Sequence, residues 1–141
     1  MKRKLVLSII LCFVAVVLFG AIEAFRAAKF IAQDKYEHQN IQKISFTLIN
    51  YAEIHGKYPT ALDDLAKDPD TNSQNAMQMF HDQFEPHYDY IPGTNGFTLT
   101  VSARNQWFGH GSRYHVEYET SKDHDVLKIN GKTSLESWIK E

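Results

Sequence analysis

Cysteine is nearly absent from this sequence, and that scarcity excludes several kinds of site. The only cysteine, Cys12, lies within an uncharged apolar run, so no intrachain disulfide can form and no cysteine-rich zinc site can be built. The seven histidines are scattered, without the four-residue helical spacing that directs two imidazoles to one ion. A phosphate loop and a dinucleotide-binding fingerprint are also missing. We therefore predict no catalytic residues, no metal and no cofactor, and a protein that is not an enzyme.

Charge is missing from one long stretch. The chain has 15 basic and 17 acidic residues, yet none lies between Leu5 and Ile22. As a helix this stretch is about 27 Å long, close to the roughly 30 Å thickness of a hydrocarbon core. We therefore predict a membrane anchor over residues 1–22 and an extracytoplasmic domain over residues 23–141. The latter is net acidic, which gives no electrostatic support for nucleic-acid binding.

The flanks of the apolar run indicate its type and orientation. A cleaved export signal has a shorter apolar core and a small-x-small cleavage site, and Ile22-Glu23-Ala24 fits such a site poorly. An uncleaved anchor is therefore favoured over a cleaved signal or a buried core helix, which both stay open. Three basic residues, Lys2–Lys4, precede the run and place the N-terminus in the cytoplasm. We expect a single-pass protein of the cell inner membrane with its C-terminal domain in the periplasm.

Glycine and proline are absent from residues 21–55, which favours a long helix. Apolar residues recur at steps of three and four in its second half, as on one face of an amphipathic helix: Ile41, Ile44, Leu48, Tyr51 and Ala52. Gly56 is suited to end the helix and Pro59 prevents its resumption. One continuous helix over residues 5–55 is the simplest prediction, and two helices hinged near Gly20 are the alternative.

The region after the helix begins with short elements. Thr60 is the expected N-cap of a short helix over residues 61–67, which Asp68-Pro69 ends. The acidic residues in and after this helix indicate a solvated face or a weak cation site. Residues 70–81 are polar and then rich in methionine, and they predict a loop with one or two helical turns over 76–80.

Beyond residue 87 the pattern changes to alternation with a period of two. Half-buried strands are predicted over 97–103, 113–119 and 125–129, with a shorter strand over 88–91. Residues 133–136 resemble a cap for a last helical turn that carries Trp138. The predicted fold class is α+β, with a long N-terminal helix, half membrane-spanning and half amphipathic, packed on a small antiparallel sheet of three to four strands.

Two sequence blocks resemble those of pilin-like proteins, specifically the major pseudopilin of type II secretion. In the first, a tyrosine near the end of the long helix is followed by Gly-x-Tyr-Pro-Thr, here Tyr51, Gly56, Tyr58, Pro59 and Thr60. In the second, an Asp and an aromatic residue precede Tyr-x-Tyr and Pro-Gly, here Asp82, Phe84, Tyr88, Tyr90, Pro92 and Gly93. The resemblance implies a pilin-like fold and a structural role for these residues.

The resemblance also implies a function and partners. We expect a membrane-anchored structural or assembly component of a type II secretion or type IV pilus-like system, which contacts the membrane and other membrane-anchored or pilin-like subunits. Two family features are missing: no glycine precedes the apolar run and no glutamate lies within it, so cleavage by the prepilin peptidase is not expected. The stretch 102–111, where the family has a calcium loop, lacks a carboxylate, so no calcium site is carried over.

Two places are candidates for contact with partners. Phe25, Ala28 and Ala32 form an apolar line suited to pack against other anchored helices, or simply to lie at the membrane interface. Trp107 and Phe108 lie between two predicted strands and either fold over the core or present an apolar contact. The alternative function is an anchored periplasmic binding or accessory module that uses a pilin-like fold without fibre assembly.

Overall fold

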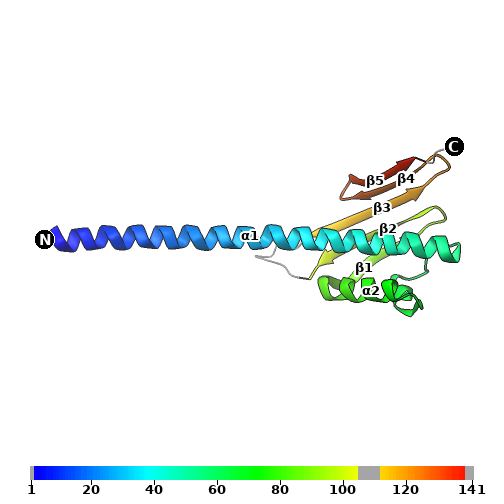
Figure 1. Ribbon diagram of the computed structural model, residues 1–141, viewed down its shortest axis with the longest axis horizontal. Helices are drawn as coiled ribbons and strands as arrows, with labels where there is room; N and C mark the ends of the chain where they lie inside the picture. The colour runs from blue at the N-terminus through cyan, green and yellow to red at the C-terminus, as the bar shows by residue number, and fades with distance from the viewer. Residues whose placement is uncertain (1, 105–111, 139–141) are drawn as a thin grey trace. The chain divides into compact units, whose positions relative to one another are not determined.

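The computed structural model describes residues 2–104 and 112–138, with side chains over 8–104 and 112–134. Its elements follow the order α1, η1, α2 and then five strands, as Figure 1 shows. The chain divides into two compact units, Met1–Tyr36 and Glu37–Glu141. The helix α1, Lys2–His55, contributes to both units and confirms the prediction of one uninterrupted helix.

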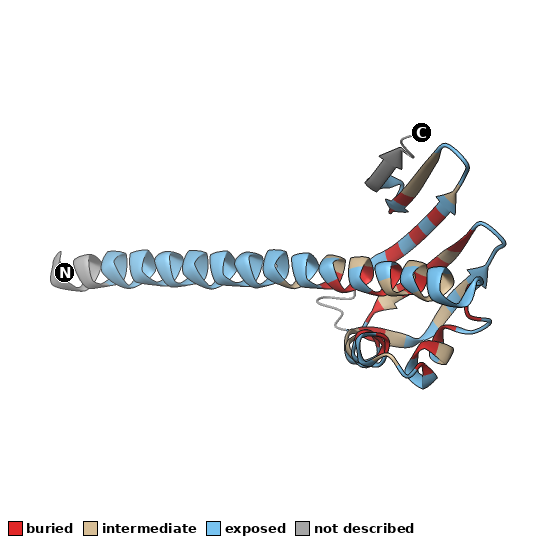
Figure 2. Ribbon diagram, turned by 45° about the vertical axis from the view of Figure 1, so that its right-hand side comes forward, coloured by how far each residue is buried: buried red, intermediate tan, exposed pale blue. Residues whose placement is uncertain are grey.

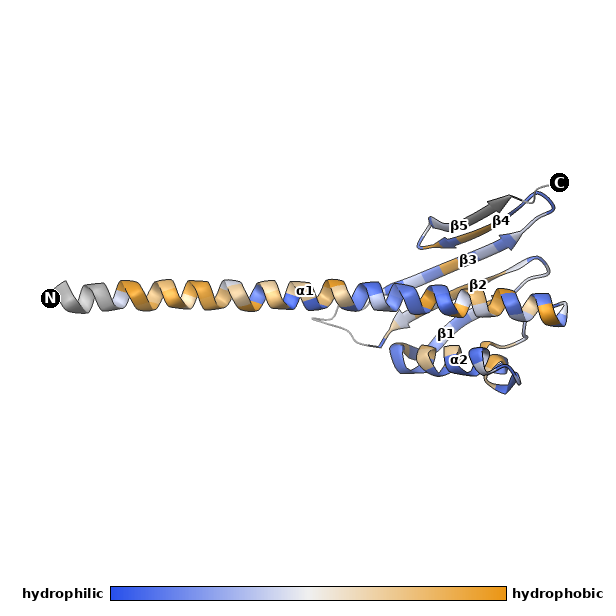
Figure 3. Ribbon diagram, in the orientation of Figure 1, coloured by the Kyte–Doolittle hydropathy of each residue, from blue (hydrophilic) through white to orange (hydrophobic). Residues whose placement is uncertain are grey.

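The first unit contains the apolar part of α1. Side chains from Ser8 through Phe30 are all exposed, and the most apolar window of the helix has no buried residue. Figure 3 shows the apolar residues concentrated in this part of the helix. Within the described chain, α1 is the one helix long and apolar enough to span a membrane.

The second unit has one hydrophobic core between the amphipathic part of α1 and the sheet. Ile41, Ile44 and Leu48, which lie on one face of the helix, are fully buried. Leu99, Val116 and Leu127 are fully buried from three neighbouring strands. Burial of each such side chain is worth roughly 1.5–3 kcal/mol, so this contact supplies much of the stability of a small domain. The predicted α+β arrangement is confirmed.

The sheet is an antiparallel meander in which strand order follows sequence order. The strands are β1 Phe84–Pro92, β2 Gly96–Ala103, β3 Arg113–Thr120, β4 His124–Ile129 and β5 Lys132–Trp138. Alternate residues of β2 and β3 point into the core, as predicted, and Figure 2 shows this alternation along β3. The register pairs Phe97 with Tyr118 and Leu99 with Val116, so residues facing the core are matched across strands.

The sheet has five strands instead of the three or four predicted. The last helical turn predicted near residue 133 is wrong, because these residues form the fifth strand. Asn130 and Gly131 have φ angles of 52° and 75°, the left-handed values of a two-residue hairpin turn. This turn directs residues 132–138 back along β4 as β5. The strand predicted over 88–91 also proves longer and begins at Phe84.

The helical turns predicted over 76–80 belong to a longer helix, α2, which spans Thr71–Gln83 and replaces the loop predicted around them. Asp70 caps it by accepting hydrogen bonds from the backbone N–H groups of Asn72 and Ser73. Four residues at helical spacing then face the core: Ser73, Ala76, Met77 and Phe80. The preceding short helix, η1, spans Leu62–Lys67 as a 3-10 helix, close to its predicted position.

Candidate functional site

The first family block forms the corner at which α1 ends. The Tyr51 ring lies 4.1 Å from the His55 ring, measured between centroids. Gly56 has a φ of 71°, a left-handed conformation that ends the helix. Tyr58 is buried and meets Phe97 edge-on at 5.6 Å, and Pro59 is buried beside it, whereas Thr60 is exposed. Tyr58 thereby connects the corner to the sheet through its contact with Phe97 of β2.

The second family block joins α2 to the first hairpin. Phe84 is fully buried, and the half-buried Tyr88 packs edge-on against Phe80 at 5.6 Å. Tyr90 is also half-buried, 6.2 Å from Phe97. The remaining members are exposed: Asp82 at the end of α2, and Pro92 and Gly93 at the β1–β2 turn. The structure thus gathers the aromatic members in the core and leaves the polar and turn members outside it.

Three tyrosines of these blocks, Tyr58, Tyr88 and Tyr90, are not suited to proton transfer at neutral pH. Burial raises the pKa of Tyr58 and Tyr90 well above the usual value for a phenol. Burial, with an additional contribution from Asp63, raises the pKa of Tyr88 to about 12. Each phenol therefore keeps its proton, and the three rings act as apolar packing groups with polar ends.

Asp68 connects the end of α1 to the start of α2. Its Oδ2 lies 3.0 Å from Nε2 of His55, and its Oδ1 accepts the backbone N–H of Asp70 at 2.8 Å. The Asp70 N–H holds the pKa of Asp68 below its usual value, with a smaller contribution from His55. The predicted acidic surface is therefore in part a set of turn and cap contacts that position two helices.

Asp64 has a comparable role at η1. Its Oδ2 accepts hydrogen bonds from the Thr60 hydroxyl and the Ala61 backbone N–H, and its Oδ1 pairs with Lys67 at 2.8 Å. The Lys67 and Thr60 hydrogen bonds lower the pKa of Asp64. The N-cap position is occupied by Ala61 and not by Thr60 as predicted, and the Thr60 hydroxyl donates to Asp64 instead of capping a backbone N–H.

A buried polar group on α1 was not predicted from the sequence. Glu37 is only 2% exposed, and its Oε2 accepts a hydrogen bond from the Tyr114 hydroxyl of β3 at 3.2 Å. Asn40, one turn later, is also buried. Glu37 lies four residues before Ile41 and seven before Ile44, so the helical stripe contained the signal for its burial.

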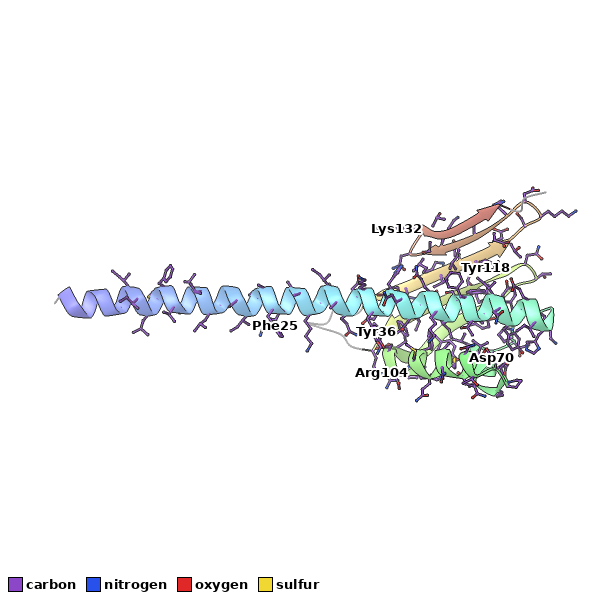
Figure 4. The ribbon with its side chains drawn as sticks, viewed as in Figure 1. Phe25, Tyr36, Asp70, Arg104, Tyr118 and Lys132 are labelled. Atoms are coloured by element: carbon purple, nitrogen blue, oxygen red, sulfur yellow. The ribbon has the colours of Figure 1, made fainter. Side chains whose placement is uncertain are left out.

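Arg104 is another residue whose role the sequence did not reveal. Its guanidinium donates to the backbone carbonyls of His81, at 2.8 Å, and Phe84, at 3.2 Å. These carbonyls lie at the C-terminal end of α2, where a cation is favoured by the helix dipole. Figure 4 shows Asp70 and Arg104 at opposite ends of α2. Both helix ends are thereby stabilised by charged side chains of the expected sign.

The residues predicted to contact partners lie mostly on α1. Phe25 is 72% exposed, and Ala28 and Ala32 are exposed as well. Trp107 and Phe108 lie outside the described residues. In the second unit, Phe46 is 45% exposed and lines an open groove of about 540 Å³ between α1 and the start of α2. Both units thus expose apolar side chains of α1 against which another helix can pack.

No group of three or more His, Cys, Asp or Glu side chains that suits a metal ion occurs in the part of the chain that the structure describes. No protein-family model, curated protein or solved structure matches this chain. Function is therefore inferred from the anchor-like helix, the residues that it exposes and the fold of the second unit.

Proposed function

We propose that this protein is a membrane-anchored, pseudopilin-like structural or assembly component of a type II secretion or type IV pilus-like system. One observation carries the proposal: α1 is apolar and exposed in its first part, and in its second part packs on an antiparallel sheet. The two sequence blocks that resemble the major pseudopilin supply core and turn residues of that domain. In this role the chain is a structural component and not an enzyme.

The charge distribution supports a specific orientation. The basic residues Lys2, Arg3 and Lys4 precede the apolar segment, which favours a cytoplasmic N-terminus. The domain of helices and strands then lies in the periplasm, anchored to the cell inner membrane. Residues 23–141 are net acidic, which gives no electrostatic support for nucleic-acid binding.

Exposed groups on α1 support assembly through helix packing. Small side chains allow the backbones of two helices to approach closely in a membrane, as Ala28 and Ala32 would permit. Phe25 adds a large exposed apolar side chain on the same part of the helix. The expected partners are other membrane-anchored or pilin-like subunits, which have helices of the same kind.

Site-specific photocrosslinking in cells tests this proposal. A photoreactive amino acid at position 28 or 32 is expected to give crosslinked products with other anchored subunits, identified by mass spectrometry. The same amino acid at Asp123, exposed in the β3–β4 connection, is the matched control and should give few products. A chain that stays uncrosslinked at positions 28 and 32, while present in the membrane at normal levels, would contradict assembly through α1.

The alternative is an anchored periplasmic binding or accessory module. It is favoured by a polar depression on the face of the sheet opposite the core, which helix packing does not require. A monomer in the crosslinking experiment that nevertheless binds a ligand at this depression would support the alternative.

A further inference from the structure

The face of the sheet that points away from the core carries many polar side chains. On β2 this face presents three hydroxyl side chains, those of Thr98, Thr100 and Ser102, between the buried residues of the same strand. On β3 it presents four charged or titratable side chains, which are Arg113, His115, Glu117 and Glu119. A solvated sheet face is normally polar, so a binding site needs further evidence of a specific shape and unsatisfied groups.

An irregularity in β1 provides the shape. Phe84 pairs with Ala103 and Tyr88 pairs with Val101, so three residues of β1 lie opposite the single residue Ser102. Extra residues of this kind bend a strand and redirect its side chains. The result is a depression of about 310 Å³, lined by Pro86, His87, Tyr88, Asp89, Thr100, Val101, Ser102 and Arg113.

Several polar groups in this depression lack partners. Within the described ranges, the structure gives no hydrogen bond or ion pair to the side chains of His87, Asp89, Ser102 or Arg113. The other described arginines differ: Arg26 pairs with Glu23, and Arg104 binds two backbone carbonyls. A guanidinium, an imidazole, a carboxylate and a hydroxyl are thus available in one depression.

Thr100 is held in a defined orientation at the centre of this group. Nε2 of His115 lies 3.1 Å from Oε1 of Glu117, so it donates its proton to that carboxylate. Nδ1 of the same ring lies 2.8 Å from the Thr100 hydroxyl oxygen and forms a hydrogen bond with it. The backbone N–H of His115 also donates to the side-chain oxygen of Asn130. Whichever of the two groups donates, the Thr100 oxygen keeps at least one lone pair with which to accept a hydrogen bond in the depression.

Donor and acceptor groups lie on different strands. Asp89 of β1 and Thr100 of β2, paired in register, are acceptors, whereas Arg113 of β3, paired with Ser102, is a donor. The formal charges of Asp89 and Arg113 cancel, which disfavours a simple anion or cation. The polar lining likewise disfavours an apolar ligand. A polyhydroxylated ligand satisfies both sets, because each of its hydroxyl groups both donates and accepts.

We propose that this depression binds one unit of a neutral saccharide. Its hydroxyl groups donate to Asp89 and Thr100 and accept from Arg113, while Ser102 and His87 complete the contacts. The open shape suits the exposed face or end of a glycan. This binding goes beyond the proposed assembly function and uses a different face of the second unit from the α1 groove at Phe46.

Saturation-transfer NMR tests the proposal on the full chain, held in a detergent without a sugar headgroup because a glycoside detergent would compete. The probes are N,N′-diacetylchitobiose and maltose. At least one is expected to receive saturation from the protein. Arg113→Met and Asp89→Asn each remove a charged hydrogen-bond partner and should weaken binding about tenfold or more.

Matched controls are Glu119→Gln on β3 and Lys128→Met on β4, both exposed but outside the lining. They should leave binding unchanged, and circular dichroism should show that all four variants remain folded. The proposal is overturned if neither disaccharide receives saturation, if the controls lose binding equally, or if inorganic phosphate displaces the disaccharide at millimolar concentration.

Co-sedimentation distinguishes the source of the saccharide. If insoluble chitin or starch retains the protein but not its Arg113→Met variant, the ligand is part of a polymer. If the disaccharide binds but neither polymer retains the protein, the ligand is a free saccharide. Equal retention of the protein and of Arg113→Met would show that contact with the polymer does not use the depression and would contradict the polymer form of the proposal.

Discussion

Tyr58 and Tyr90 pack against the same ring, Phe97, from different elements. Tyr58 follows the corner of α1, whereas Tyr90 belongs to β1, and both phenols are largely removed from water. The sequence blocks that contain them were predicted to be structural, and these contacts provide the physical reason. A buried ring contributes a large apolar area, so the spacing of aromatic residues follows the needs of the core.

Glu37 shows where prediction from single residues fails. A glutamate within a polar segment is normally expected in solvent, because removing its charge from water is costly. Here the Tyr114 hydroxyl, from a residue 77 positions later in the chain, lies against its carboxylate. Pairing of this kind depends on the packed fold, and the sequence around residue 37 contains no indication of its partner.

Asp68 leads to a prediction about pH. Its pKa is lowered in the folded state, so the contacts of its carboxylate contribute stability above the unfolded pKa, about 3.9, and this contribution is lost as pH falls through the folded value. Asp68→Asn should therefore lower the free energy of unfolding at pH 7, and the difference from the native chain should shrink towards pH 2.5. Urea unfolding followed by circular dichroism at several pH values measures it.

Asp123→Asn is the control for this experiment, since Asp123 is exposed in the β3–β4 connection. It should change the stability little at any of these pH values. A difference between Asp68→Asn and the native chain that stays constant from pH 7 to pH 2.5 would show that the carboxylate charge is not what stabilises the turn.

At the level of elements, prediction succeeded where a periodic pattern was long. The helix α1 lacks glycine and proline over many turns, and β2 and β3 alternate buried residues with half-buried or exposed ones. It underestimated the length of α2, because the face of this helix towards the core is narrow and its first turn is polar throughout. It failed for β5 because the Asn130-Gly131 turn, and not the local cap-like pattern, determines the direction of the chain.

The cap of α2 gives a prediction at this scale. Asp70→Ala removes the acceptor for two backbone N–H groups and should destabilise the domain by about 0.5–2 kcal/mol. Asp70→Asn retains a good N-cap and should preserve most of the stability, which separates capping from general effects of substitution. Chemical unfolding of the three proteins measures the difference. Equal stability of Asp70→Ala and the native chain would mean that packing alone holds the start of α2.

At the level of the whole molecule, the structure divides into two compact units with different chemistry. One is a helical segment with exposed apolar side chains, and the other is a domain with its own core. Exposure of such a segment to water is unfavourable, because its apolar side chains do not gain the free energy of transfer from water to an apolar environment. A lipid bilayer accommodates the segment, because it surrounds the apolar side chains with hydrocarbon and the helix forms its backbone hydrogen bonds internally.

The candidate site was less predictable than the apolar helix. The polar depression depends on the strand register and on an irregularity in β1, and no local sequence pattern indicates either.

The proposed orientation gives the last prediction. Alkaline phosphatase, which is active only after export, is fused behind residue 141. The fusion should be active and should sediment with membranes, because the basic residues before the apolar segment retain the N-terminus in the cytoplasm. A fusion that lacks residues 1–22 is the control and should be soluble and inactive.

Val14→Arg tests the apolar segment itself. A charge near the centre of a spanning helix costs about 2.5–3.5 kcal/mol of insertion free energy, so this variant should have less membrane-bound phosphatase activity. An inactive full-length fusion that still sediments with membranes would reverse the orientation and place the domain in the cytoplasm.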